Sequence, residues 1–140
     1  AMFDLDRFKS FNDTMGHAAG DAVLIETARR LRENLRAVDL LARIGGEEFL
    51  IVMPGAGLAN AKRAAQRLCQ KVRATPFDVP GPHAPITATI SIGMTVCDPD
   101  MTAPMTLPIS AEALLDRADK ALYGAKADGR DRVTLSRPAA

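Results

Sequence analysis

Cysteine is scarce in this sequence: Cys69 and Cys97 are the only two among 140 residues, and no C-x-x-C pattern occurs. This excludes a disulfide-stapled scaffold and a cysteine zinc site, and it suits a reducing cytosol. Net charge is low as well, because 18 basic residues nearly balance 17 acidic ones to give +1. No overall charge therefore marks the chain as a binder of nucleic acid or of a membrane surface.

Long apolar runs are also missing. No stretch approaches the roughly 20 residues that a membrane-spanning helix needs, and the start of the chain has no signal-peptide pattern. The remaining composition is ordinary, with 47% hydrophobic and 25% charged residues, which excludes intrinsic disorder, collagen and coiled coil. We therefore expect one cytoplasmic domain over residues 1–140, long enough to build its own core.

Hydrophobic periodicity predicts an alternation of strands and helices. Apolar residues at helical spacing, together with a short mixed segment near the start, predict helices over 7–15, 21–36, 58–75 and 110–128. Short apolar runs predict strands over 1–5, 40–44, 48–53, 86–96 and 133–136. The run over 86–96 alternates apolar and polar residues, a pattern that is typical of a half-buried strand.

The order of these elements indicates the fold class. A Gly-Gly pair between two short strands predicts a β-hairpin whose primed turn needs positive φ. A hairpin in the middle of the chain requires antiparallel pairing, and amphipathic helices cover sheets. We predict an α+β sandwich of the ferredoxin-like kind, with a central, mainly antiparallel sheet of about five strands and helices packed on it.

Carboxylates gather at two predicted strand ends. Asp4 and Asp6 lie where the first strand ends, and Glu47 and Glu48 lie in the hairpin turn. If these strands are neighbours, Asp4 and the glutamates converge at one sheet edge, as carboxylates that hold Mg²⁺ beside substrate phosphates do. The alternative, an exposed turn acid, is our interpretation of Asp6 alone. For the whole group we favour a cation, because adjacent like charges otherwise repel.

Two further sets of polar residues have spacings of interest. Asn12 and Asp21 flank a Gly-His pair, and together they can recognise the edge of a purine. The alternative is that Asp13 or Asp21 caps a helix, and we interpret His17 as structural. Lys126 and Arg130 are spaced i, i+4 on a predicted helix face. There they either complement the negative helix end or hold phosphates.

Seven segments of the sequence together form a pattern: FDLDRFK (3–9), ND (12–13), GHAAGD (16–21), GGEEF (45–49), SIG (91–93), ADKALYGAK (118–126) and GRD (129–131). In order and spacing they resemble the GGDEF family, the diguanylate cyclases. Agreement at many separated positions is far more specific than one short motif. The resemblance implies a nucleotide-cyclase-like sandwich that joins two GTP into cyclic di-GMP, a bacterial second messenger, and releases two pyrophosphates.

The resemblance also implies the residues of the active site, with two Mg²⁺ (or Mn²⁺) ions. The implied metal ligands are Asp4, the backbone carbonyl of Leu5 and one of Glu47 and Glu48. The other glutamate would help to deprotonate the ribose 3′-hydroxyl, and which glutamate has which role stays open.

Substrate contacts follow from the same resemblance. Phosphate contacts are implied for Phe8, Lys9, Lys126 and Arg130, and guanine contacts for Asn12 and Asp21. Gly45 and Gly46 would let the backbone approach the nucleotide, because no Cβ blocks it. Asp21 favours GTP over ATP, since a carboxylate accepts from guanine N1–H whereas adenine has no donor there.

A second site is implied for the product. Arg36 and Asp39 match the family's R-x-x-D inhibitory site for cyclic di-GMP, and Arg67 matches a secondary contact. Arg can bind a phosphate or a guanine edge bidentately. The alternative is an ordinary surface Arg–Asp pair at a helix end.

The resemblance is incomplete at the start of the chain. The family's usual N-terminal helix and the first half of strand one are missing, so we expect weak activity from this fragment. Catalysis would need a homodimer, and an upstream sensory or regulatory domain is expected in the full protein, which a missing segment could anchor to a membrane. Two alternatives stay open: a catalytically silent module that binds cyclic di-GMP, and a cyclase that makes cyclic GMP.

Overall fold

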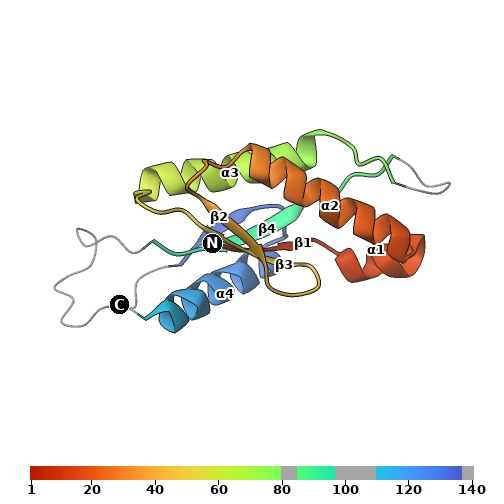
Figure 1. Cartoon of the computed structure of the whole chain (residues 1–140). Helices are drawn as coiled ribbons and strands as arrows, with labels where there is room; N and C mark the ends of the chain where they lie inside the picture. The colour runs from red at the N-terminus through yellow and green to blue at the C-terminus, as the bar shows by residue number, and fades with distance from the viewer. Residues whose placement is uncertain (80–84, 97–109, 137–140) are drawn as a thin grey trace.

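The computed structural model describes residues 1–79, 85–96 and 110–136, in which one sheet has helices on both faces (Figure 1). The strands are β1 (Met2–Leu5), β2 (Leu40–Arg43), β3 (Glu48–Val52), β4 (Ile90–Met94) and β5 (Val133–Leu135). The helices are α1 (Phe8–Met15), α2 (His17–Glu33), α3 (Leu58–Ala74) and α4 (Ala111–Ala127). The predicted order of elements is confirmed.

Strand β1 lies at the centre of the sheet, whose order is β2-β3-β1-β4-β5. Three of the four neighbouring pairs are antiparallel, and only β4 and β5 are parallel. The parallel pair is joined through α4, because parallel neighbours need a crossover connection. The predicted α+β class with a mainly antiparallel sheet is therefore confirmed.

The two faces of the sheet have different partners (Figure 1). Phe3 and Phe49 stack with ring centroids 4.7 Å apart on the face that α2 and α3 cover. Since side chains alternate along a strand, Met2 and Leu50 point to the other face, where they pack with Leu122 of α4. One face therefore holds the larger core, and the other meets α4.

Strand β4 departs from the prediction of a half-buried strand. All five of its residues are buried, because α4 covers the face on which the predicted polar residues Ser91 and Gly93 lie. A Cβ at Gly93 would lie 2.0 Å from the backbone nitrogen of Leu122 and 2.2 Å from the carbonyl oxygen of Ala118. Glycine at this position thus lets the backbone of α4 rest directly on the strand.

Three local predictions are wrong. Helix α2 begins at His17 rather than at Asp21, so Asp21 lies inside a helix and does not cap one. Helix α4 ends at Ala127, so Arg130 does not share a helix face with Lys126. Neither glycine of the hairpin has positive φ. Four residues separate β2 from β3, whereas a primed turn has a two-residue loop, so no primed turn is needed.

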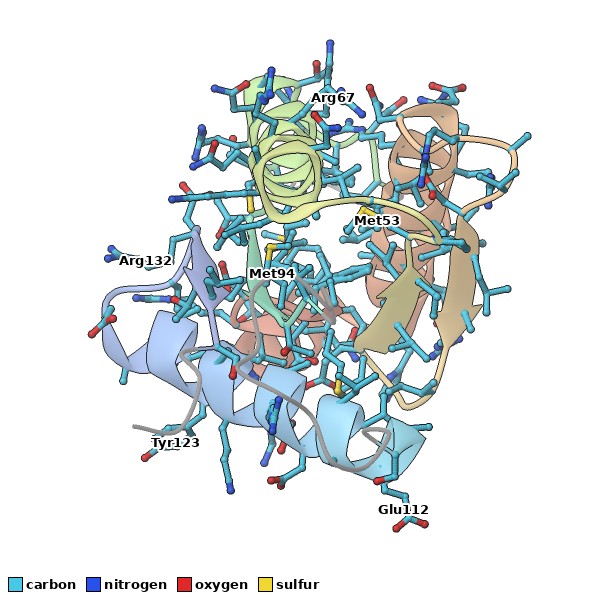
Figure 2. All side chains as sticks on the ribbon, turned by 90° about the vertical axis from the view of Figure 1, so that its left-hand side faces the viewer. Met53, Arg67, Met94, Glu112, Tyr123 and Arg132 are labelled. Atoms are coloured by element: carbon cyan, nitrogen blue, oxygen red, sulfur yellow. The ribbon has the colours of Figure 1, made fainter. Side chains whose placement is uncertain are left out.

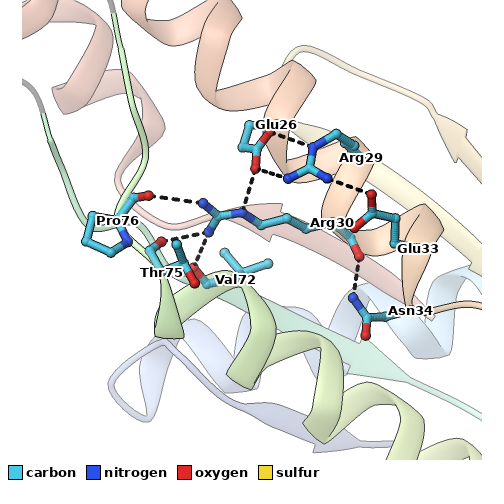
Figure 3. Close-up of polar contacts among 8 residues, drawn as sticks. All are labelled: Glu26, Arg29, Arg30, Glu33, Asn34, Val72, Thr75 and Pro76. Atoms are coloured by element: carbon cyan, nitrogen blue, oxygen red, sulfur yellow. Dashed lines mark hydrogen bonds and ion pairs between the residues drawn. The ribbon is translucent and has the colours of Figure 1, made fainter.

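Helices α2 and α3 are joined by a buried arginine (Figure 3). The Arg30 guanidinium donates to the carbonyls of Val72, Thr75 and Pro76 at the end of α3, at 2.7 to 3.2 Å. It also lies 3.9 Å from the centroid of the Phe77 ring. Arg30 therefore satisfies carbonyls that a helix end leaves without partners. Within the described residues, no helix is long and apolar enough to cross a membrane.

Candidate functional site

Asp4 and Glu48 face each other across the centre of the sheet. They are direct partners in the antiparallel register of β1 and β3, so their side chains leave the same face at short range. The Asp4 side chain is 5% exposed, and its Oδ1 has no hydrogen-bond partner. The predicted convergence of Asp4 with the hairpin acids is therefore confirmed for Glu48.

The electrostatics of this pair favour a cation. Burial raises the pKa of the Glu48 carboxyl, and the negative charges of Asp4 and Asp119 raise it further. No group of three or more His, Cys, Asp or Glu side chains is arranged to hold a metal in the part of the chain that the structure describes. The buried, unpartnered Asp4 oxygen beside Glu48 nevertheless fits a hard divalent cation whose other ligands are backbone and substrate oxygens.

Glu47 lies next to this pair, in the turn between β2 and β3. Arg43 holds the turn by donating to the carbonyls of Gly45 and Gly46, with a shortest distance of 2.7 Å. A Cβ at Gly45 would lie 3.2 Å from Glu48 Oε2, so a side chain there would press on the carboxylate. Nothing lies within 4 Å of the corresponding position at Gly46. Arg43 was not among the residues that the sequence singled out.

Helix α4 brings cationic residues to the same edge of the sheet. The Lys126 ammonium is paired with Asp4 Oδ2, so one carboxylate oxygen already has a positive partner. Arg130 lies in the loop after the helix, and its N–H donates to Ala125 O at 2.9 Å. Lys126 and Arg130, two of the four residues predicted to contact phosphates, therefore come from a helix end and from the loop that follows it.

The predicted nucleotide contacts on α1 and α2 are also neighbours. A Cβ at Gly20 would lie 1.7 Å from Asn12 Oδ1, so glycine alone allows these helices to pack at this point. Asn12 Oδ1 is buried without a partner, and the adjacent Asp21 is exposed. At the start of α1, the Phe8 side chain is buried and Lys9 is exposed. The Leu5 side chain is buried in the core.

Asp6 is a residue that the sequence interpretation underrated. It is not an exposed turn acid, because its carboxylate accepts hydrogen bonds from the Thr89 and Ser91 hydroxyls and from the N–H of Asp131. The Asp-x-Asp spacing was the available signal, since i and i+2 side chains share one face of a strand.

The predicted product site forms a compact ion pair. Arg36 Nη2 donates to Asp39 Oδ1 at 2.8 Å and to Pro54 O at 2.9 Å. The Asp39 side chain is 3% exposed; burial alone would raise its pKa, but hydrogen bonds and charge from Arg36 lower it overall. Arg67, on the outer side of α3 in Figure 2, donates to Asn34 O at 2.9 Å. The buried Asp39 carboxylate is thus already paired with Arg36, whereas about half of the Arg36 side chain stays exposed.

An apolar cleft of about 660 Å³ lies elsewhere, at the opposite end of the sheet. The start of β1, the end of β3 and the first turn of α4 line it, with Val52, Met94 and Leu115 among the lining residues. None of the predicted catalytic or substrate-binding residues lines this cleft, so it is distinct from the candidate site.

Comparison with known proteins agrees with this geometry. Residues 1–132 match the family described as "Diguanylate cyclase, GGDEF domain". Response regulator PleD of Caulobacter vibrioides is 46% identical over 132 residues, which are 94% of this chain and 28% of that protein. Diguanylate cyclase A of Treponema denticola is 41% identical over 136 residues, which are 97% of this chain and 34% of that protein. The chain thus spans about a third or less of these relatives.

Solved structures show the same arrangement. The GGDEF domain of DgcB from Caulobacter crescentus, in complex with c-di-GMP, matches with a TM-score of 0.86 and 29% identity, covering 98% of this chain and 74% of that one. The GGDEF domain of TpbB (YfiN) from Pseudomonas aeruginosa matches with a TM-score of 0.85 and 36% identity, covering 97% and 74%. The chain therefore belongs to the GGDEF-domain family of diguanylate cyclases.

Proposed function

We propose that this domain condenses two GTP molecules into cyclic di-GMP and releases two pyrophosphates. The direct opposition of Asp4 and Glu48 at one sheet edge, beside the ammonium of Lys126, carries the proposal. Membership of the diguanylate cyclase family supports it. Joining two nucleotides requires carboxylates that can accept a proton or hold a metal, and a cation for the phosphates, which Asp4, Glu48 and Lys126 can supply at this edge.

The chemistry is two nucleophilic displacements at phosphorus. In each, the 3′-hydroxyl of one GTP attacks the α-phosphorus of the other, a P–O bond forms, and the bond to pyrophosphate breaks. The hydroxyl proton goes to a carboxylate, for which Glu47 and Glu48 are the candidates. Burial and the charge of Asp4 raise the pKa of Glu48, which makes its carboxylate a stronger proton acceptor.

Two Mg²⁺ or Mn²⁺ ions fit this site, with Asp4, the Leu5 carbonyl and one of Glu47 and Glu48 as ligands. When bound, such ions lower the pKa of the hydroxyl and screen the leaving pyrophosphate. The Asp4 oxygen that has no partner is the observation that fits them. Apart from this, the protein positions the attacking hydroxyl and the α-phosphate, and such positioning is a large part of catalysis of phosphoryl transfer.

Several groups are proposed to hold the nucleotide. The first turn of α1, at Phe8 and Lys9, offers backbone N–H groups and an ammonium to phosphates. Lys126 and Arg130 contact phosphates from the other side. Asn12 and Asp21 contact guanine.

Gly45 and Gly46 are proposed to let the hairpin turn approach the nucleotide closely. The expected partners in the cell are GTP, cyclic di-GMP, a second copy of the domain and a regulatory domain in a longer, cytoplasm-facing protein. Because each copy binds one GTP, catalysis requires two copies that face each other.

The test is GTP turnover by the chain fused to a dimerising coiled coil, in the presence of Mg²⁺. We expect cyclic di-GMP as the product, with less product from the unfused chain at equal concentration. Glu47→Gln and Glu48→Gln, made separately, should each lower turnover, with the proton acceptor losing about 100-fold or more. Glu112→Gln, a matched change at the far end of α4 in Figure 2, should leave turnover unchanged.

Three results would contradict the proposal. Cyclic GMP as the product would favour a one-substrate cyclase. Tight binding of cyclic di-GMP without turnover would favour a silent receptor module. Full turnover by a protein that carries both Glu47→Gln and Glu48→Gln would remove the hairpin acids from the mechanism.

We propose in addition that Arg36, Asp39 and Arg67 bind the product and inhibit the enzyme. The exposed half of Arg36 is the group that can meet a phosphate or a guanine edge.

A further inference from the structure

We infer that Asp6 is a positioning residue that holds the phosphate-binding loop after α4 against the strand that carries Asp4; this inference rests on the proposed function. Asp6 follows β1 directly and lies two residues after Asp4. Their side chains therefore leave the strand on the same face. That face is the one that α4 covers.

Asp6 collects hydrogen bonds from two distant parts of the chain. Its Oδ2 accepts from Thr89 Oγ1 at 2.7 Å and from the Asp131 N–H at 3.0 Å, and its Oδ1 accepts from Ser91 Oγ at 2.5 Å. The backbone N–H of Asp6 donates to Thr89 O at 2.9 Å. With both oxygens engaged, the carboxylate has one orientation and joins β1, β4 and the loop after α4.

The loop that Asp6 contacts has an unfavourable backbone. Arg130 and Asp131 adopt left-handed φ values of 65° and 48° in succession, a region that residues with a Cβ rarely occupy. Such a conformation persists only where its surroundings hold it. Here the Asp131 carboxylate accepts from Arg73 Nη1 of α3 at 2.9 Å, and the Asp131 N–H donates to Asp6.

Asp4 and Asp6 thus hold the two segments that carry the Lys126 and Arg130 side chains. Asp4 pairs with Lys126 in the last turn of α4. Asp6 binds Asp131, the immediate neighbour of Arg130. If Asp6 lost its contact, the loop would shift Arg130 while the Lys126 pair stayed in place. The proposed contact of Arg130 is with a phosphate that is present both in the bound GTP and in the transition state. A shifted Arg130 would weaken both states equally, so KM would change more than kcat.

The experiment uses the coiled-coil fusion with GTP and Mg²⁺ and compares Asp6→Asn with the parent protein. Asn keeps the size of the side chain but removes one acceptor oxygen. We expect KM for GTP to rise about tenfold while kcat stays within about threefold. Asp116→Asn, a matched change at an exposed surface pair on α4, should change neither value.

A double-mutant cycle separates positioning from a merely structural role. If Asp6 acts through Arg130, Asp6→Asn combined with Arg130→Ala should have the KM of Arg130→Ala alone. A purely structural Asp6 would lower thermal stability and leave KM unchanged, and independent KM effects would multiply; either result would overturn the inference. Should Asp6→Asn fail to fold, Arg73→Gln, at a half-exposed pair, should raise KM about threefold in the same non-additive way.

Hydrogen exchange provides a readout that needs no turnover. The Asp131 amide should exchange faster in Asp6→Asn than in the parent protein, because its acceptor is weakened. Unchanged exchange would overturn the inference even if GTP turnover were normal. Absence of cyclic di-GMP formation by the parent protein would instead refute the proposed function, while the exchange result would still decide whether Asp6 holds the loop.

Discussion

A missing side chain at Gly93 decides how closely α4 approaches the sheet. Two backbone atoms of α4 lie within 2.2 Å of the position that a Cβ would occupy. Backbone atoms in the middle of a helix cannot move aside as the end of a flexible side chain can. The glycine of the Ser-Ile-Gly segment is therefore a packing requirement, and its effect on function is indirect, through the placement of Lys126.

We expect Gly93→Ala to destabilise the protein by about 3 kcal/mol, because the methyl group forces the helix off the strand. Urea unfolding followed by circular dichroism measures this change. Gly124→Ala is the matched control: its nearest neighbour would be Thr134 Cγ2 at an ordinary 3.7 Å. Gly124 lies in the last turn of α4, where replacing glycine by alanine should stabilise by about 0.5 kcal/mol. Equal stability of the two variants would refute the packing argument.

Among the elements, α3 takes hydrogen-bond donors for the carbonyls at its C-terminal end from a side chain of α2. The carbonyls at its C-terminus receive the Arg30 guanidinium, which Glu26 orients from α2 at 3.0 Å (Figure 3). Because the N–H groups of a guanidinium point in fixed directions, several carbonyl acceptors fix both the distance between the two helices and their relative orientation. The register between the two helices on this face is thus set by one long side chain in addition to apolar packing.

Arg30→Met keeps most of the apolar stem and removes the donors. We expect a loss of about 3 kcal/mol in unfolding free energy, because buried carbonyls lose charge-assisted hydrogen bonds. The neighbouring Arg29 also binds Glu26 but is more than half exposed, so Arg29→Met should cost less than about 1 kcal/mol. Thermal or urea unfolding measures both free energies. Equal losses would show that the hydrogen bonds from Arg30 to the carbonyls at the end of α3 contribute little.

At the scale of the whole molecule, short strands join the two proposed sites. Strand β2 begins immediately after Asp39 and ends at Arg43, the residue that holds the hairpin turn. A ligand bound to Arg36 would therefore act at one end of a strand whose other end leads into the turn with the proposed catalytic acids. Through this strand, a ligand bound at Arg36 would be linked directly to the hairpin turn.

We expect Arg36→Ala in the coiled-coil fusion to relieve inhibition by cyclic di-GMP, because the exposed guanidinium that meets the ligand is gone. Initial rates of GTP turnover with increasing added product measure the effect, and the inhibitory concentration should rise about tenfold or more. Arg63→Ala, which removes an exposed arginine elsewhere on α3, should leave inhibition unchanged. Undiminished inhibition of Arg36→Ala would refute the proposed product site.

Local features of the chain predicted much of the fold and part of the site. The types and order of the elements follow from periodicity, and the start of α4 follows from Ser110, whose hydroxyl accepts from the Ala113 N–H as an N-cap. The meeting of Asp4 and Glu48 followed from one assumption, that β1 lies beside the hairpin. The start of α2 was missed because His17 to Gly20 carries no apolar repeat.

The sequence by itself determined which segments become strands or helices, because those choices depend on residues a few positions apart. It also determined, through spaced motifs, the family to which the chain belongs. Only the tertiary structure decided that β4 is buried on both faces, that Arg130 leaves the helix, and that Asp6 is bound. These outcomes depend on contacts across long separations, such as the sequence separation of 125 between Asp6 and Asp131. No local pattern records such a contact, because the partner becomes a neighbour only when the sheet and α4 have assembled.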